Sequence, residues 1–227
     1  MARMNATNAE TPKNRRPWVV GVSGASGTPY SVAVIRGLLD AGEDVDLIVS
    51  RGSRLTIIDE TGIAFRDSHR RDDLAAWLEV PADSVQLDRV RYWPAGDLGA
   101  GPASGSYRVK GMVVVPASTA CCAGIALGLS KDLLQRAAEV NLKERRPLVV
   151  VPRETPFTRA TLKRLLELDE AGAVVLPASP AFYHAPKAVQ ELVDFVAGKV
   201  LDILGVEHDL FRRWDGELGA ARSNPND

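Results

Sequence analysis

The stretch RAAEVNLKERRPLVVVPRETP, residues 136–156, predicts a helix, a turn and a buried strand in succession. Residues 147–152 are almost all apolar, which is typical of a central parallel strand that is covered on both faces. Arg153 and Glu154 follow this strand directly, and charge at that point indicates a polar crevice. Because ligands of open α/β sheets bind outside the carboxyl ends of the strands, the stretch predicts a site as well as a fold.

Strands alternate with helices along the rest of the chain. We expect apolar strands at 18–22, 45–49, 111–115, 148–151 and 173–176, with a weaker strand-like segment at 83–92. We expect helices at 30–39, 51–61, 119–127, 131–142, 158–171 and 189–204, a short amphipathic piece at 72–78, and a loop at 93–107. The alternation predicts an α/β fold, a single-domain, Rossmann-like (flavodoxin-like) doubly wound parallel sheet with helices on both faces.

Length and composition favour one domain without a metal or a nucleic-acid partner. The chain has 227 residues, of which 45% are hydrophobic, enough for one core spanning 18–214. We expect residues 1–17 to be a disordered or arm-like tail, and 215–227 a loose one. The 28 basic and 29 acidic residues balance, so no global charge recruits nucleic acid or membrane. The histidines have no metal-ligand spacing and are His69, His184 and His208.

Targeting signals are not expected either. No apolar run approaches the ~20 residues that span a bilayer. The polar first 17 residues contain Glu10 and no apolar core segment, so they do not resemble a secretory signal. The only cysteines, Cys121 and Cys122, are adjacent and unsuited to bridging each other, which favours a reducing compartment and a cytoplasmic location.

Two turns of small residues follow predicted strands. GVSGASG, residues 21–27, would let backbone amides approach an anion at a helix start, although tight packing alone also explains such a turn. The turn matches neither a P-loop nor the G-x-G-x-x-G motif of dinucleotide-binding proteins. The second strand ends at Ser50, where an NAD-binding protein would have an acidic residue that holds the ribose. A mononucleotide therefore fits this site better than NAD. The second turn, PASTAC at 116–121, has Ser and Thr that are most simply helix caps. Two such turns on one sheet edge favour a nucleotide crevice.

Four blocks of sequence resemble the UbiX-type flavin prenyltransferases. They are GVSGASGTPY, PASGSYRVKGMVVVPAS, the 136–156 stretch and LPASPAFYHAP, and the resemblance runs from about residue 19 to 214. It places the chain in a flavoprotein family that also includes the phosphopantothenoylcysteine and peptidyl-cysteine decarboxylases. It implies metal-independent transfer of dimethylallyl from dimethylallyl phosphate to N5 and C6 of reduced FMN. The product, prenylated FMN, would serve a UbiD-type decarboxylase, and the family forms dodecamers with sites at subunit junctions.

The resemblance also assigns site residues. Flavin contacts would be Gly24, Ala25, Ser26, Ser50, Ser118, Thr119, Ala120, Cys121 and Arg153. The prenyl-phosphate pocket would comprise Arg136, Lys143, Glu154, Tyr183 and Lys199, with Leu98 and Trp214 bordering it. Lys143 would neutralise the leaving phosphate, and Glu154 would protonate it, provided that Glu154 is buried. Ser26 would relay a proton during ring closure, and Glu60 would assist that stage.

Simpler interpretations remain open for several of these residues. Lys143 suits the solvated end of a helix, Glu154 an ion pair with Arg153, and Lys199 a side chain extended along the surface. Tyr183 suits the core. Leu98 stands where many relatives have an aromatic residue, usually Trp, whose π face can stabilise allyl-cation character.

Two further departures bear on function. Trp93, five residues before Leu98, is a candidate substitute for the missing ring, and the turn after Pro116 lacks a Lys that is common in relatives. These departures leave open a non-catalytic subunit that binds or carries FMN or prenylated FMN for a decarboxylase system. A cysteine-decarboxylase activity is disfavoured, because the chain has neither the Pro-x-Met-Asn-x-x-Met-Trp segment nor an early catalytic His.

Overall fold

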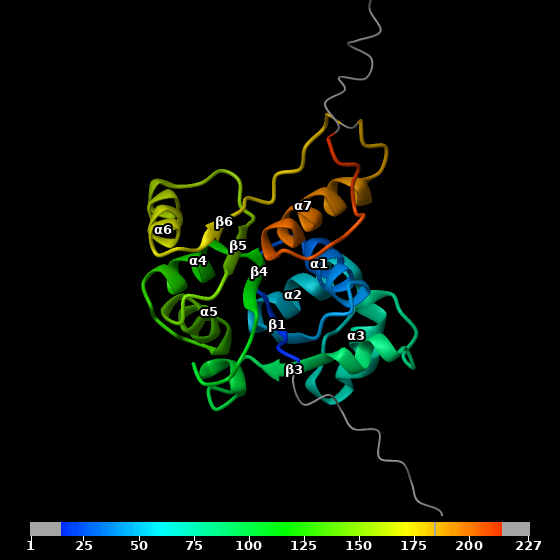
Figure 1. Ribbon diagram of the computed structural model, residues 1–227, viewed down its shortest axis with the longest axis horizontal. Coiled ribbons are helices and arrows are strands. Elements are labelled where there is room, and N and C mark those ends of the chain that lie inside the picture. Colours follow the sequence, from blue (N-terminus) through cyan, green and yellow to red (C-terminus); the bar gives the residue numbers. More distant parts are fainter. Residues whose placement is uncertain (1–14, 184, 215–227) are drawn as a thin grey trace, which may run out of the picture.

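The computed structural model describes residues 15–183 and 185–214 (Figure 1). Most of the expected N-terminal tail, residues 1–14, lies outside the described residues, as does the expected C-terminal tail, residues 215–227. Among the residues described, no helix has the length and apolar character needed to cross a membrane.

One parallel sheet forms the centre of the domain. Its strands are β1 (Trp18–Val22), β2 (Val45–Val49), β3 (Val90–Pro94), β4 (Gly111–Ala117), β5 (Leu148–Pro152) and β6 (Val174–Val175). They lie in the order β3-β2-β1-β4-β5-β6, and every pair is parallel. The predicted doubly wound α/β fold is confirmed. The chain reverses its winding direction between β1 and β4, so the ligand crevice is expected outside the carboxyl ends of these two strands.

Helices cover both faces of the sheet (Figure 1). They are α1 (Thr28–Asp40), α2 (Arg51–Thr61), α3 (Arg70–Leu78), α4 (Thr119–Ala126), α5 (Leu133–Lys143), α6 (Arg159–Glu170) and α7 (Val189–Leu204). Side chains alternate along each strand, so β1 contributes Val20 and Val22 to a core with α1, α3 and α7. Val19 points the other way, into a core with α4, α5 and α6.

Two glycines set how closely helices approach their neighbours. A Cβ on Gly21 would lie 2.9 Å from Leu134 Cγ, so α5 packs directly against β1. A Cβ on Gly37 would lie 2.5 Å from Leu201 Cδ1, so α1 and α7 cross at close range. The close crossing holds α7 against the domain although it is the last helix in the chain.

The strand-like prediction for residues 83–92 is only partly right. Val85–Arg89 forms a 3-10 helix, η2, capped by the Ser84 hydroxyl, which accepts a hydrogen bond from Gln86 N at 3.3 Å. β3 starts at Val90 and extends to Pro94, into the predicted loop, because the backbone pairs there with β2. The rest of that loop includes a short 3-10 turn, η3 (Gly101–Ala103). η1 (Asp67–His69) precedes α3.

Candidate active site

A buried serine joins the two small-residue turns at the carboxyl edge of the sheet. Ser23 is 3% exposed, and its hydroxyl donates to Pro116 O at 3.0 Å while accepting from Ser118 N at 2.7 Å. Ser23 N also donates to Pro116 O, at 3.2 Å. The Pro116 carbonyl is available to Ser23 because the β4–β5 register shifts between Val114 and Ala117. The β1–α1 and β4–α4 turns therefore form one continuous floor.

We predict that Ser23→Ala lowers the free energy of unfolding by about 1–3 kcal/mol, because it leaves the amide of Ser118 unpaired. For a chain of this size the melting temperature should fall by roughly 2–4 °C per kcal/mol, as measured by differential scanning calorimetry. Ser68→Ala is the matched control, since the exposed Ser68 hydroxyl bonds only His69 Nδ1, at 2.9 Å. Equal melting temperatures for the two variants would contradict the role of Ser23.

Helix α2 lies along the β1–α1 turn. At its start, a Cβ on Gly24 would lie 3.0 Å from the backbone carbon of Gly52, so the two backbones touch with no room for a side chain. Ser50 caps this end of α2, and its hydroxyl accepts from Ser53 N at 3.1 Å. The resemblance predicted a role for Gly24 and Ser50. Ser23 and Gly52 were not identified, because in the sequence alone they look like ordinary turn residues.

The other end of α2 also reaches this turn, through Glu60. Its carboxylate accepts from Gly27 N at 2.9 Å, and from Thr28 N at 2.8 Å and Thr28 Oγ1 at 2.7 Å. Burial opposes ionisation, but hydrogen bonds from Thr28, Ser26 and the backbone outweigh it and hold the pKa of Glu60 below its ordinary value. Because the folded-state pKa is lowered, this stabilisation is present at neutral pH and is lost as pH falls through that pKa.

Arg153 and Glu154 stand at the end of β5, beside the same turn. The guanidinium of Arg153 donates through Nε to Ser26 O at 2.9 Å, and its own amide donates to Ala117 O at 3.2 Å. Glu154 is exposed in the single chain, and its carboxylate accepts from Thr155 N at 2.9 Å. The burial expected for a proton donor is therefore not provided by this chain alone. The alternative ion pair between Glu154 and Arg153 is not formed among the described residues.

The second turn caps α4 and buries both cysteines. The Ser118 hydroxyl accepts from Cys121 N at 3.2 Å, while Thr119 and Ala120 face outward in part. Cys121 and Cys122 are buried free thiols, and burial raises the pKa of both, that of Cys122 to about 12. The raised pKa favours the protonated form of both thiols, which suits a packing role, and the Cys121 amide bonds the Ser118 hydroxyl.

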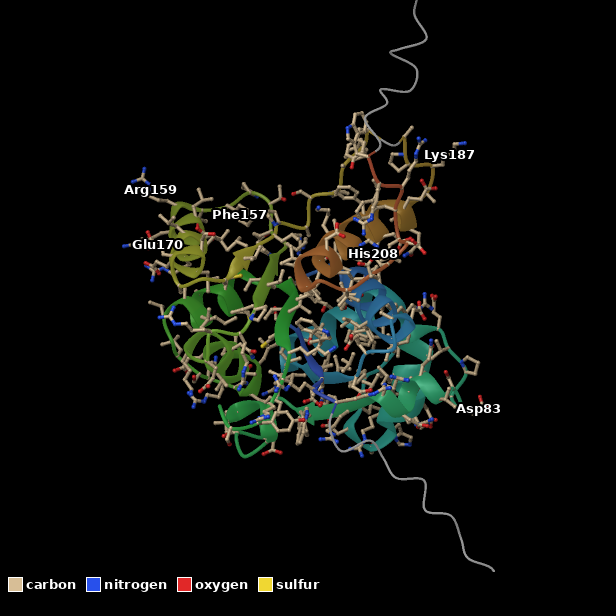
Figure 2. The ribbon with its side chains drawn as sticks, viewed as in Figure 1. Asp83, Phe157, Arg159, Glu170, Lys187 and His208 are labelled. Atoms are coloured by element: carbon tan, nitrogen blue, oxygen red, sulfur yellow. The ribbon has the colours of Figure 1, made fainter. Side chains whose placement is uncertain are left out.

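Tyr183 and Trp214 contact each other beside α7. Their rings meet edge to face with centroids 5.9 Å apart, and Tyr183 also meets Phe195 of α7 at 6.1 Å. Tyr183 belongs to the segment that projects beyond α7, where Figure 2 shows Lys187 at the outer end. Tyr183 is 58% exposed, so it is not a core residue. Lys199, on α7, pairs with Asp202 at 3.4 Å.

Arg136 and Lys143 lie on α5, which runs back from the carboxyl edge of the sheet to its amino edge. Arg136 pairs with Glu139 at 3.0 Å, and Lys143 with Glu144 at 2.6 Å. Lys143 ends α5, so β5, about 16 Å long, separates it from Glu154. The two charge clusters of the 136–156 stretch thus lie at opposite edges of the sheet within one chain.

The loop that carries Leu98 is anchored by aromatic side chains. Tyr107 donates to the buried Asp46 at 2.8 Å and meets the Trp93 ring edge to face at 6.4 Å. Arg91 lies 5.7 Å from the Trp93 ring centre. Trp93 is therefore held in this anchor, and Leu98 is 53% exposed.

These features suit a nucleotide with a phosphate and a planar ring. The close approach of Gly24 to Gly52 brings the β1–α1 turn and the start of α2 together, an arrangement that we call the cradle, and Arg153 has no carboxylate partner in the described part of the chain. No cluster of three or more His, Cys, Asp or Glu residues suitable for a metal occurs among residues 15–183 and 185–214. A parallel sheet with such turns at its switch point defines a nucleotide-binding α/β protein.

Comparisons with known proteins narrow this class. The Flavoprotein family model matches residues 6–201. A Streptomyces coelicolor protein described as "Flavin prenyltransferase UbiX" is 65% identical over 212 residues, 91% of this chain and 98% of that protein. The crystal structure of AnUbiX (PadA1) in complex with FMN and dimethylallyl pyrophosphate has a TM-score of 0.78 at 34% identity, and covers 90% of this chain and 100% of that one. A dodecameric FMN-dependent UbiX-like decarboxylase from Escherichia coli O157:H7 has a TM-score of 0.76 at 36% identity, over 88% of this chain and 100% of that one.

The chain belongs to the Flavoprotein family and, within it, to the flavin prenyltransferases called UbiX. The resemblance that the four sequence blocks indicated is therefore confirmed at the level of the family.

Proposed function

We propose that the protein transfers a dimethylallyl group from dimethylallyl monophosphate to N5 and C6 of reduced FMN. The observation that carries this proposal is the contact between Arg153 Nε and Ser26 O at 2.9 Å. It joins the segment that carries a carboxyl group (Glu154) to the turn that carries a hydroxyl (Ser26), and a second carboxyl group (Glu60) binds the same turn. A subunit that merely carried a flavin would need no such set of acid and base groups.

Reduced FMN would supply the nucleophilic N5 and C6 atoms, and the chain would supply binding and proton transfer. Glu154 would give a proton to the departing phosphate, and cations would stabilise the charge that develops on it. The backbone at Gly24 and Ala25, the Ser50 and Ser118 caps, and Arg153 would hold the flavin. The neighbouring Thr119, Ala120 and Cys121 would complete the wall of the flavin site.

A complete phosphate pocket would need a second copy of the chain. Lys143 lies at the opposite edge of the sheet from Glu154 in one chain, so it would reach the Glu154 of a neighbour, with Arg136 of the same helix beside it. Burial of Glu154 would come from the same contact. The dodecameric E. coli relative supports a homo-oligomer of this kind. Tyr183, Lys199 and Trp214 would close the pocket from the α7 side.

The product would pass to a UbiD-type decarboxylase, and the protein would act in the cytoplasm. Two buried free thiols support a reducing compartment. The relation to the UbiX flavin prenyltransferases supports the recipient, because prenylated FMN is the cofactor that such a decarboxylase would take up.

Anaerobic incubation with reduced FMN tests the activity. Dimethylallyl monophosphate and diphosphate are supplied separately, with a metal chelator present, and the flavin is then analysed by mass spectrometry. A flavin heavier by C5H8 is the expected product with the monophosphate. Bound but unmodified FMN with both donors would refute the proposal and favour the carrier.

We predict that Leu98→Trp raises the rate of transfer about 2- to 30-fold, because a ring facing the departing allyl group would add cation–π stabilisation of about 0.5–2 kcal/mol. Leu98 is 53% exposed, so the larger side chain requires no repacking of the core. Leu127→Trp is the control, since Leu127 is 54% exposed at the end of α4. Single-turnover rates measure the effect, and equal rates for both variants would contradict a role for position 98.

A further inference from the structure

Helix α1 starts without a capping side chain of its own. Its N-cap is Gly27, at φ 107° in the left-handed region, and its first turn contains no acidic residue. The first amides of a helix have no partner within the helix. Glu60 supplies the missing acceptor from the last turn of α2, 33 residues further along the chain.

Thr28 adds a side-chain donor to this cap. It is 0% exposed, and its hydroxyl and its amide both donate to Glu60 Oε2, at 2.7 and 2.8 Å. Gly27 N donates to both oxygens, at 2.9 and 3.1 Å. The carboxylate is therefore held in one orientation, and the Thr28 hydroxyl is a donor in this set that a substitution can remove without altering the backbone.

We infer that Thr28 is a positioning residue, whose buried hydroxyl holds Glu60 as a carboxylate beside Ser26, ready to accept the proton released when the prenyl ring closes. This inference rests on the proposed function. Ring closure forms a bond to flavin C6 and breaks the C–H bond there, while the prenyl double bond gains one proton. One proton is released and one is taken up, so no oxidant or reductant is required.

The charged groups on the neighbouring elements have partners of their own. The hydrogen-bond donors at the start of α1 therefore determine the ionisation of Glu60. A cavity of about 320 Å³ next to Glu60 is lined by Arg36 of α1, Glu79 after α3 and Gln190 of α7. Arg36 and Glu79 pair with each other at 2.8 Å, and Arg153, on the far side of the turn, is held by Ser26 O. The hydrogen bonds at the start of α1 thus account for the lowered pKa of Glu60.

The first test is the pH profile of transfer by Thr28→Val, which keeps the shape of threonine and removes its hydroxyl. Loss of a hydrogen bond to the carboxylate should raise the pKa of Glu60, so less of the base form remains at acidic pH. We expect the rate to fall about tenfold on the acid limb and less than twofold on the alkaline plateau, with the limb moved to higher pH. Thr28→Ser, which retains the hydroxyl, should restore the wild-type profile.

The second test needs no flavin. Infrared difference spectra across a pH titration of the flavin-free full-length protein follow the carboxyl groups, and Glu60→Gln identifies the band of Glu60. We expect the titration midpoint of that band to move to higher pH in Thr28→Val and to return in Thr28→Ser. Thr56→Val is the control, because the Thr56 hydroxyl donates to Ser53 O within α2, at 2.9 Å.

The outcomes separate the two claims. A wild-type protein that makes no prenylated flavin refutes the proposed function, while the infrared titration still decides whether Thr28 controls Glu60. An active wild type together with unchanged pH profile and midpoint in Thr28→Val overturns the inference. If Thr28→Val does not fold, Thr28→Ala removes the same hydroxyl with better helix propensity, and the same criteria apply.

Discussion

Glu154→Gln should reduce the rate of prenyl transfer by about 10²- to 10⁴-fold, the range over which general acid catalysis contributes. Glutamine can still hydrogen-bond to a phosphate, but it has no acidic proton to give to the departing oxygen. The affinity for FMN should change little, because the residue that contacts the β1–α1 turn is Arg153, which binds Ser26 O, and not Glu154. Single-turnover assays with reduced FMN and dimethylallyl monophosphate measure the rate, and fluorescence titration measures the binding of FMN.

Glu170→Gln is the matched control for Glu154→Gln. Glu170 ends α6, and Figure 2 shows it on the outer side of that helix. Its substitution should leave the rate within twofold of wild type. A Glu154→Gln enzyme that retains more than a tenth of the wild-type rate would exclude Glu154 as the proton donor.

Gly24→Val should weaken FMN binding about 10- to 100-fold, because loss of a hydrogen bond from the displaced turn to the charged phosphate costs about 1.5–3 kcal/mol. Any Cβ at this position would lie 3.0–3.1 Å from backbone atoms of Gly52, and neither backbone can yield as a flexible side chain would. The β1–α1 turn would have to move away from the start of α2, which opens the cradle. Equilibrium dialysis with FMN gives the dissociation constants.

Gly96→Val is the control for Gly24→Val, since a Cβ on Gly96 would meet nothing within 4 Å. In the flavin-free state, both variants should melt within a few degrees of the wild type. The loss of FMN affinity in Gly24→Val would then come from a local change at the turn and not from unfolding. An affinity within threefold of wild type in Gly24→Val would show that the flavin does not use this cradle.

Most of the fold was predictable from hydrophobic patterns. The apolar runs at β1, β2, β4 and β5 are buried on both faces, so their strands required no knowledge of their neighbours. β3 was less predictable because it is an edge strand of mixed burial, and its bounds depend on pairing with β2. The Ser84 cap that turns residues 85–89 into a 3-10 helix is a local detail that the strand-like pattern obscured.

The candidate site was predictable only in part. Small residues after β1 and β4 indicated a nucleotide crevice, the charge after β5 placed Arg153 and Glu154 at it, and the resemblance to UbiX proteins assigned their roles. Ser23 and Thr28 were missed because serine and threonine in such turns carry no distinctive signal. Each acts through a partner distant in sequence, Ser118 for the first and Glu60 for the second.

The amino-acid sequence was sufficient to predict the alternation of strands and helices, the family, and the residue types that the chemistry requires. These depend on local periodicity and on short motifs, which a linear chain displays directly. Three relations became visible only in the folded chain: Glu60 caps α1, Trp93 anchors the loop of Leu98, and Lys143 and Glu154 stand at opposite edges of the sheet. Such relations arise from packing between segments far apart in the chain, because the direction of each helix relative to its strands, and not spacing along the sequence, fixes which side chains meet.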